Sequence, residues 1–131
     1  MASGRILCVD DDRTVLRSLK AQLRRRFKGR LVIETAESVD EALELLDELE
    51  EDGDLEGALV VISDWLMPGR KGDALLLEVR KRYPGAVSIL LTGQADADAR
   101  DRVRNEARAS ALDKPWLEDE LSRIIETGLA S

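Results

Sequence analysis

The most apolar segment of the chain is ALVVISD, residues 58–64, in which five apolar residues precede a serine and Asp64. An unbroken apolar run of this length is typical of a strand buried on both faces, as strands of parallel sheets are. Turn-forming residues follow at Pro68, Gly69 and Gly72, and they indicate an irregular loop. The segment therefore predicts a central strand that ends with a carboxylate at the edge of a buried sheet.

Short apolar runs alternate with longer segments of helical periodicity along the rest of the chain. The other expected strands are residues 6–9, 31–36, 86–91 and 109–113, the last of them short and weak. The expected helices are residues 15–27, 39–49, 74–83, 95–107 and 117–129. Strands that alternate with helices predict an α/β doubly wound fold, with a parallel sheet covered by helices on both faces. Right-handed crossovers then place the C-terminal ends of all the strands on one edge.

Length, charge and residue types limit the classes of function. The 131 residues fit a single domain, residues 1–131, and the net charge of −7 argues against direct nucleic-acid binding. The sequence has no histidine and one cysteine, Cys8, which excludes Ser-His-Asp and Cys-His catalysis and any histidine-ligated metal site. No apolar run is long enough to cross a membrane, and no signal peptide is visible, so we expect a cytoplasmic protein without a membrane partner.

Chemically active side chains occur where four of the expected strands end. They are Asp10, Asp11 and Asp12 after the first strand, Asp64 after the third, Thr92 after the fourth and Lys114 after the fifth. One aspartate after a strand is usually a turn or a helix cap, but acids, a hydroxyl and an amine at one edge predict a functional site. Clustered carboxylates repel one another unless a cation is bound, and oxygen ligands alone favour Mg²⁺. A carboxylate can attack phosphorus, and hydroxyl and ammonium groups can stabilise the transferred phosphoryl oxygens.

Four stretches together resemble the signature of response-regulator receiver domains. They are ILCVDDD at residues 6–12, VVISDWLMPG at residues 60–69, ILLTG at residues 89–93 and KPW at residues 114–116. The stretches come in the family's order, and the resemblance covers essentially the whole chain. It implies a flavodoxin-like fold with five helices and the strand order 2-1-3-4-5. It also implies a phosphoprotein of two-component signalling and phosphorelays, in which Asp64 takes a phosphoryl group as an aspartyl phosphate.

The resemblance implies Mg²⁺ as the cofactor and assigns ligands to it. Asp11 and Asp64 would bind the ion directly, and the carbonyl of Leu66 would be the third protein ligand. Asp10 would act mostly through a metal-bound water. The resemblance thus gives four residues a role at the metal.

The phosphoryl group is expected to meet Thr92 and Lys114, and the bond before Pro115 is expected to be cis. The implied partners are a sensor histidine kinase or phosphotransfer protein, a downstream output domain, and a second copy joined through the fourth helix, fifth strand and fifth helix. The Leu-Thr-Gly and Lys-Pro-Trp stretches are similar to receivers that precede output domains, cyclic-dinucleotide phosphodiesterases among them. The chain would be a signalling domain rather than a conventional enzyme, although it would catalyse its own phosphorylation and dephosphorylation.

One position departs from the family pattern. Family members usually carry Tyr or Phe three residues before the lysine, where this chain has Ala111. The ring normally moves inward with the threonine, so we predict a signal carried mainly by the backbone around Thr92 and Gly93. Leu66 and Gln94 flank the expected path of the hydrolytic water, and we predict slow to moderate self-dephosphorylation.

Two other functions are compatible with parts of the sequence. The stretch DDDRTV, residues 10–15, also matches the opening motif of haloacid-dehalogenase-type phosphatases, with Asp10 as nucleophile and Asp12 as acid and base. That chemistry gives Asp64 no role, and the chain is short for such an enzyme. A receiver-like interaction module that is never phosphorylated is the second alternative, which Ala111 permits and the complete set of site residues opposes.

Overall fold

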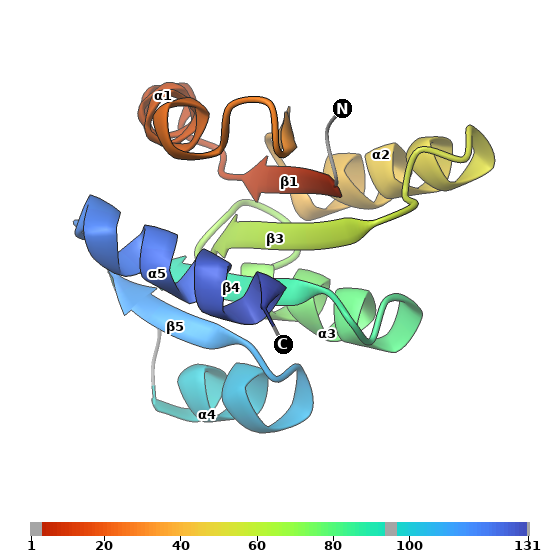
Figure 1. Cartoon of the computed structure of the whole chain (residues 1–131). Coiled ribbons are helices and arrows are strands. Elements are labelled where there is room, and N and C mark those ends of the chain that lie inside the picture. Colours follow the sequence, from red (N-terminus) through yellow and green to blue (C-terminus); the bar gives the residue numbers. More distant parts are fainter. Residues whose placement is uncertain (1–3, 94–96, 131) are drawn as a thin grey trace.

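A five-stranded parallel sheet forms the centre of the computed structural model, which describes residues 4–93 and 97–130 (Figure 1). Its strands are β1 (Gly4–Val9), β2 (Val32–Ala36), β3 (Ala58–Asp64), β4 (Val87–Thr92) and β5 (Ser110–Asp113). Their order across the sheet is β2-β1-β3-β4-β5, so β3 lies at the centre. The predicted doubly wound fold and strand order are therefore confirmed.

Five helices cover the two faces of the sheet. They are α1 (Arg13–Phe27), α2 (Val39–Glu51), α3 (Gly72–Arg82), α4 (Ala97–Glu106) and α5 (Glu118–Leu129). Apolar residues of α1 and α5 pack on one face, and those of α2, α3 and α4 pack on the other. The predicted helix boundaries agree with these to within a few residues, but Gln94 and the expected start of the fourth helix at residue 95 lie outside the described residues.

The central strands are apolar throughout because both of their faces are covered. Val60 and Ile62 of β3 pack on the side of α1 and α5, and Val61 between them packs on the side of α2 and α3. Successive side chains of a strand point to opposite faces, so a strand with helices on both sides needs apolar residues at every position. All three side chains have no exposed surface.

Two helices begin at side chains that accept hydrogen bonds from the first turn. Asp12 is the N-cap of α1, and its carboxylate accepts from the backbone N–H groups of Thr14 at 2.9 Å and Val15 at 3.4 Å. Ser38 caps α2 by accepting from the N–H of Glu41 at 3.1 Å. A cap of this kind stabilises a helix by about 1 kcal/mol. The carboxylate of Asp12 therefore serves as the N-terminal cap of α1.

Strand β5 is short, and helix α4 is lightly anchored. The strand has four residues, as the weak fifth strand of the prediction implies, and only Leu112 of them is buried. In α4 the buried side chains are Ala99 and Val103. Among the described residues, no helix has both the length and the apolar character needed to cross a membrane.

Cys8 is buried in the middle of β1, and we expect it to be unreactive in the folded protein. Burial raises the pKa of its thiol to about 12, so only roughly one part in ten thousand is thiolate at pH 8. A thiol reagent should therefore modify Cys8 only as the protein unfolds. The modification rate, followed in increasing urea, should rise together with the loss of circular dichroism. Complete modification within minutes without denaturant would contradict this expectation.

Candidate functional site

The predicted site residues meet at the edge where the strands end. Asp64 is the last residue of β3 and pairs with Leu91 of β4, and Thr92 is the last residue of β4 and pairs with Asp113 of β5. Asp10 directly follows β1. The N–H of Lys114 donates to the carbonyl of Thr92 at 3.0 Å, which continues the β4–β5 ladder by one step beyond Asp113. The parallel sheet thus brings together residues that are up to 104 positions apart.

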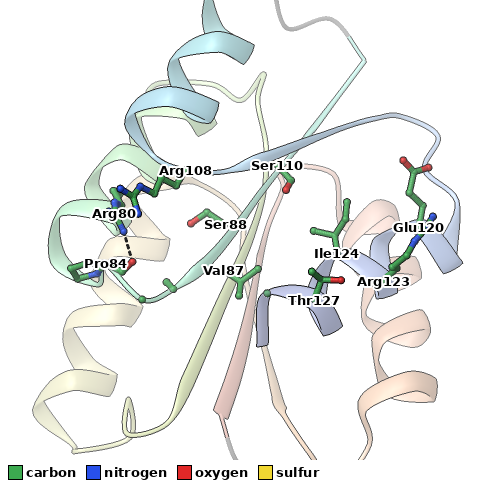
Figure 2. A pocket seen from close by; sticks show the side chains of 13 residues that line it. Arg80, Pro84, Val87, Ser88, Arg108, Ser110, Glu120, Arg123, Ile124 and Thr127 are labelled. Carbon is green, nitrogen blue, oxygen red and sulfur yellow. Dashed lines mark hydrogen bonds between the residues drawn. The ribbon is translucent and has the colours of Figure 1, made fainter. Parts of the chain in front are cut away.

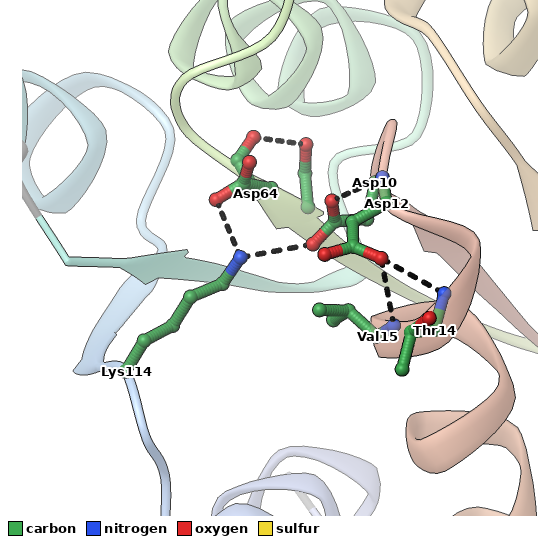
Figure 3. A network of polar contacts seen from close by, with 7 residues as sticks. Asp10, Asp12, Thr14, Val15, Asp64 and Lys114 are labelled. Atoms are coloured by element: carbon green, nitrogen blue, oxygen red, sulfur yellow. Dashed lines mark hydrogen bonds and ion pairs between the residues drawn. The ribbon is translucent and has the colours of Figure 1, made fainter.

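Lys114 bridges two carboxylates at the centre of this site (Figure 3). Its ammonium nitrogen Nζ lies 2.9 Å from Oδ2 of Asp10 and 2.9 Å from Oδ1 of Asp64. Asp10 is 2% exposed and Asp64 is 8% exposed, so both charges are largely removed from water. The lysine offsets part of the repulsion between them.

A third carboxylate completes an acidic cluster. Ligand oxygens of Asp10, Asp11 and Asp64 all lie within 4.8 Å of one another. Asp11 is exposed, so the cluster opens to solvent on its side. Three carboxylates with no nitrogen or sulfur donor are the kind of ligand set that hard cations such as Mg²⁺ prefer. Asp12, adjacent in sequence, caps α1 and does not belong to the cluster.

The surroundings of Asp64 and Lys114 change their proton affinities. Burial raises the pKa of Asp64, and the neighbouring Asp10 and Asp11 raise it further, whereas the hydrogen bond and charge of Lys114 act in the opposite direction. Burial by itself would lower the pKa of Lys114, but its hydrogen bonds to Asp10 and Asp64 raise it above the ordinary value. In the absence of a cation, the folded protein therefore carries an electrostatic cost when Asp64 is ionised.

We expect the Asp64→Asn variant to be more stable than the wild type when both are free of metal at neutral pH. The raised pKa means that the folded state binds the Asp64 proton more tightly than the unfolded chain does, so ionisation disfavours folding. The cost is absent below the ordinary aspartate pKa and grows as the pH rises through the raised value. Thermal unfolding in EDTA should show a Tm difference that is small in acid and larger at pH 7. An equal difference at all pH values would contradict this origin.

A close approach of Gly72 fixes the backbone of Asp64, although the sequence pattern around this glycine indicates only a loop. A Cβ at Gly72 would lie 2.0 Å from the carbonyl oxygen of Asp64 and 2.8 Å from Oγ of Ser63. The Ser63 hydroxyl donates to that same carbonyl at 2.9 Å, and the N–H of Gly72 donates to Trp65 at 2.9 Å. The start of α3 therefore holds the end of β3 from one side.

Helix α4 is joined to the site region by ion pairs that sequence patterns did not indicate. Arg100 pairs with Asp113, the residue before Lys114, and Arg102 pairs with Asp73 in the first turn of α3 at 3.0 Å. Asp73 is buried, whereas both arginines lie on the polar face of the helix. Ala111 is half-buried and packs against the cluster formed with α2, α3 and α4. Charged contacts thus link α4 to β5 and α3.

Two tryptophans flank the site with different surroundings. Trp65, next to Asp64, is largely buried, its Nε1 has no hydrogen-bond partner among the described residues, and Lys71 lies 4.7 Å above its ring. Trp116 donates from Nε1 to Gln22 of α1 at 2.8 Å and packs with the α1 and α5 side of the core. The Lys114–Pro115 bond is cis, as predicted. Trp116 therefore anchors the segment that leads into α5.

Comparison with known proteins adds independent findings. The sequence model described as response regulator receiver domain matches residues 6–126. The chain is 31% identical over 131 residues to the DNA-binding transcriptional regulator NtrC of Escherichia coli (strain K12), covering 99% of this chain and 26% of NtrC. It is 34% identical over 125 residues to the sensor kinase CckA of Brucella abortus (strain 2308), covering 95% of this chain and 12% of CckA.

A solved structure agrees over the same length. The signal receiver domain of an HD domain-containing protein from Pseudomonas fluorescens Pf-5 matches with a TM-score of 0.82 at 28% identity, covering 99% of this chain and 89% of that one. The chain spans about a quarter of the length of NtrC and a smaller part of CckA. The common part in each comparison is the receiver, whose role in response regulators is to accept a phosphoryl group. This chain belongs to the response regulator receiver domain family.

Proposed function

We propose that Asp64 is the residue that accepts the phosphoryl group, with Lys114 and Thr92 as the groups that stabilise it. The observation that carries the proposal is the position of the Lys114 ammonium, 2.9 Å from a carboxylate oxygen of Asp64 and 2.9 Å from one of Asp10. An ammonium held beside the nucleophile lies close to where negative charge gathers on a transferred phosphoryl group.

The acidic cluster fits a magnesium ion by the chemistry of its donors. Asp11 and Asp64 would hold the ion directly, the Leu66 carbonyl would be a third ligand, and Asp10 would bind through a water. The bound ion would neutralise charge on the phosphoryl oxygens. The chain itself contributes a fixed set of carboxylates and a backbone that Gly72 holds in place.

The transfer follows from the groups at the sheet edge. A carboxylate oxygen of Asp64 attacks the phosphorus of a phosphohistidine, a P–O bond forms as the P–N bond breaks, and the imidazole nitrogen keeps the electron pair. The Lys114 ammonium then pairs with a phosphoryl oxygen in place of the carboxylate oxygen. Thr92, 1% exposed at the end of β4, supplies a hydroxyl for a second phosphoryl oxygen. Attack by water on the phosphorus of the acyl phosphate releases inorganic phosphate and restores the Asp64 carboxylate.

We propose partners of the kinds that act with receiver domains. The donor is a sensor histidine kinase or a phosphotransfer protein, and the phosphorylated form acts on a second copy through α4, β5 and α5 or on an output domain. NtrC is a DNA-binding transcriptional regulator and CckA a sensor kinase, and each is several times longer than this chain. We propose that residues 1–131 form one receiver domain and that it works in the cytoplasm.

The alternatives from the sequence are not favoured. A phosphatase of the haloacid-dehalogenase type would need Asp12 as its acid and base, but the Asp12 carboxylate is used to cap α1. A module that is never phosphorylated would have no need for a cluster of three carboxylates whose repulsion Lys114 offsets only in part.

Labelling with acetyl phosphate and Mg²⁺ tests the assignment. The wild type should gain the mass of one phosphoryl group, and the Asp64→Asn variant should gain none. Asp12→Asn is the matched control because asparagine also caps helices well, so it should be labelled as the wild type is. Labelling that survives in Asp64→Asn and is lost in Asp10→Asn would support the phosphatase instead. A wild type that cannot be labelled would leave the interaction module as the function.

A further inference from the structure

A hollow of about 780 Å³ lies at the edge of the sheet opposite to Asp64, where β4 and β5 begin (Figure 2). Its lining comes from the end of α3 and the loop that follows it, from Arg108, from the first residues of β4 and β5, and from one side of α5 between Glu120 and Gly128. The volume lies within the range of pockets that hold small molecules. None of its lining residues belongs to the proposed phosphorylation site.

The hollow exists because β5 is short. Ser110, the first residue of β5, pairs with Ile89, so no described residue of β5 pairs with Val87 or Ser88 of β4. Helix α5 packs closely on the first residue of β4. A Cβ atom added at Gly128 would lie only 2.6 Å from a methyl carbon of Val87. Because β5 does not extend as far back as Val87 and Ser88, the edge of β4 next to α5 is not covered by a neighbouring strand.

Basic side chains from three different elements converge on this hollow. They are Arg80 of α3, Arg108 between α4 and β5, and Arg123 of α5, whereas Glu120 is the one acidic residue in the lining. Among the described residues, no carboxylate forms an ion pair with Arg108 or Arg123. Figure 2 shows Arg80 and Arg108 on one side of the hollow and Arg123 on the other. Arg80 donates to the carbonyl of Pro84, and no carboxylate among the described residues neutralises any of the three arginines. Positive charge without a carboxylate partner, in a chain with a net charge of −7, indicates an anionic ligand.

The backbone of Arg108 strengthens this argument. Its φ of 51° lies in the left-handed region, at the turn after α4 where the N–H groups of Ala107 and Ala109 both donate to Val103. Glycine is the residue that adopts this conformation without strain. Arg108 therefore adopts a conformation that glycine would adopt without strain, and its side chain lines the hollow.

The remaining lining determines the kind of anion. Pro84, Val87 and Ile124 provide apolar surface, and the hydroxyl of the largely buried Ser88 lies between the two groups of arginines. Guanidinium groups bind phosphate through paired N–H donors and stack on planar rings. A ligand with a phosphate end and a flat, less polar end fits both parts of the lining. We propose that this hollow binds a nucleotide, with its phosphates on the arginines and its base on the apolar surface.

Titration with ATP in EDTA tests the proposal, because chelation keeps the nucleotide from reaching the acidic cluster through a metal. We expect saturation at or below about 1 mM, with amide NMR shifts at Val87, Ser88 and Ser110. The Arg108→Gly and Arg123→Gln variants should each weaken binding about tenfold or more. Arg108→Gly should keep or raise the Tm, since it removes the left-handed strain together with the charge. A loss of binding in that variant would therefore not reflect misfolding.

Two further variants separate the hollow from other sites. Arg104→Gln removes an exposed charge of α4 that pairs with Asp101 outside the hollow, and it should leave binding within about twofold. Asp64→Asn should bind ATP as the wild type does, so failure of the proposed phosphorylation would not affect this result. Equal weakening in Arg104→Gln would show unspecific attraction and overturn the proposal. Three other results would also overturn the proposal. They are binding of tripolyphosphate as tight as that of ATP, tighter binding of a hexaglutamate peptide than of ATP, and ATP binding that does not saturate.

Discussion

The Lys114→Met variant is expected to accept a phosphoryl group from acetyl phosphate at least about a hundredfold more slowly than the wild type. Methionine keeps much of the length of the side chain but removes the ammonium that lies 2.9 Å from both Asp10 and Asp64. The transferring group would then lack a fixed positive charge at the position where its own charge increases. The rate of mass increase at saturating Mg²⁺ measures the effect directly.

The same substitution should also reduce the stability of the metal-free protein, by about 1–3 kcal/mol. It leaves two largely buried carboxylates close together without a cationic partner, and their repulsion disfavours the folded state. Added Mg²⁺ should restore most of the stability but not the labelling rate, which separates the structural role of Lys114 from its chemical role. Lys81→Met, an exposed change on α3, is the control and should alter neither. A normal rate in Lys114→Met would remove the lysine from the proposed chemistry.

The Gly72→Ala variant is expected to lose roughly 3 kcal/mol of the free energy of unfolding. The new Cβ would lie 2.0 Å from the carbonyl oxygen of Asp64, and the obstructing atom is backbone at the end of the central strand. Either α3 or the end of β3 must move, and both are packed on the core. Urea denaturation followed by circular dichroism gives the loss of stability.

Gly85→Ala is the matched control for this effect. A Cβ at Gly85 would meet no atom within 4 Å, so its cost should stay within about 0.5 kcal/mol. If Gly72→Ala folds, its labelling by acetyl phosphate should be slower than that of the wild type, because Asp64 is displaced from Lys114. Gly72→Ala and Gly85→Ala of equal stability would show that α3 does not position the end of β3.

The sequence was sufficient to predict the sheet because burial on both faces leaves an unmistakable apolar run, as in residues 58–62. It also predicted the site, since parallel strands must end at one edge, and Asp10, Asp64 and Lys114 meet there. The three consecutive aspartates could not be distinguished in the same way. Asp10 and Asp11 belong to the cluster and Asp12 to the cap of α1. The residue pattern alone does not separate these roles, whereas the family resemblance gives only Asp10 and Asp11 a role at the metal.

Other features depend on contacts between distant elements and had no local pattern. Gly72 looks like any loop glycine until α3 is placed against Asp64. Arg100 and Arg102 look like ordinary charges on a polar helix, although their partners lie on β5 and α3. The hollow at the start of β4 forms because β5 begins only opposite Ile89. The sequence alone does not show that β5 starts later than β4, so it does not predict the hollow.

The attachment of α4 has a consequence for how this domain responds to its surroundings. Two small buried side chains and the ion pairs of Arg100 and Arg102 hold the helix, whereas the other helices rely on larger apolar faces. Dissolved salt screens partly exposed charges and leaves apolar packing intact. A rise in ionic strength therefore loosens α4 before it affects the rest of the fold.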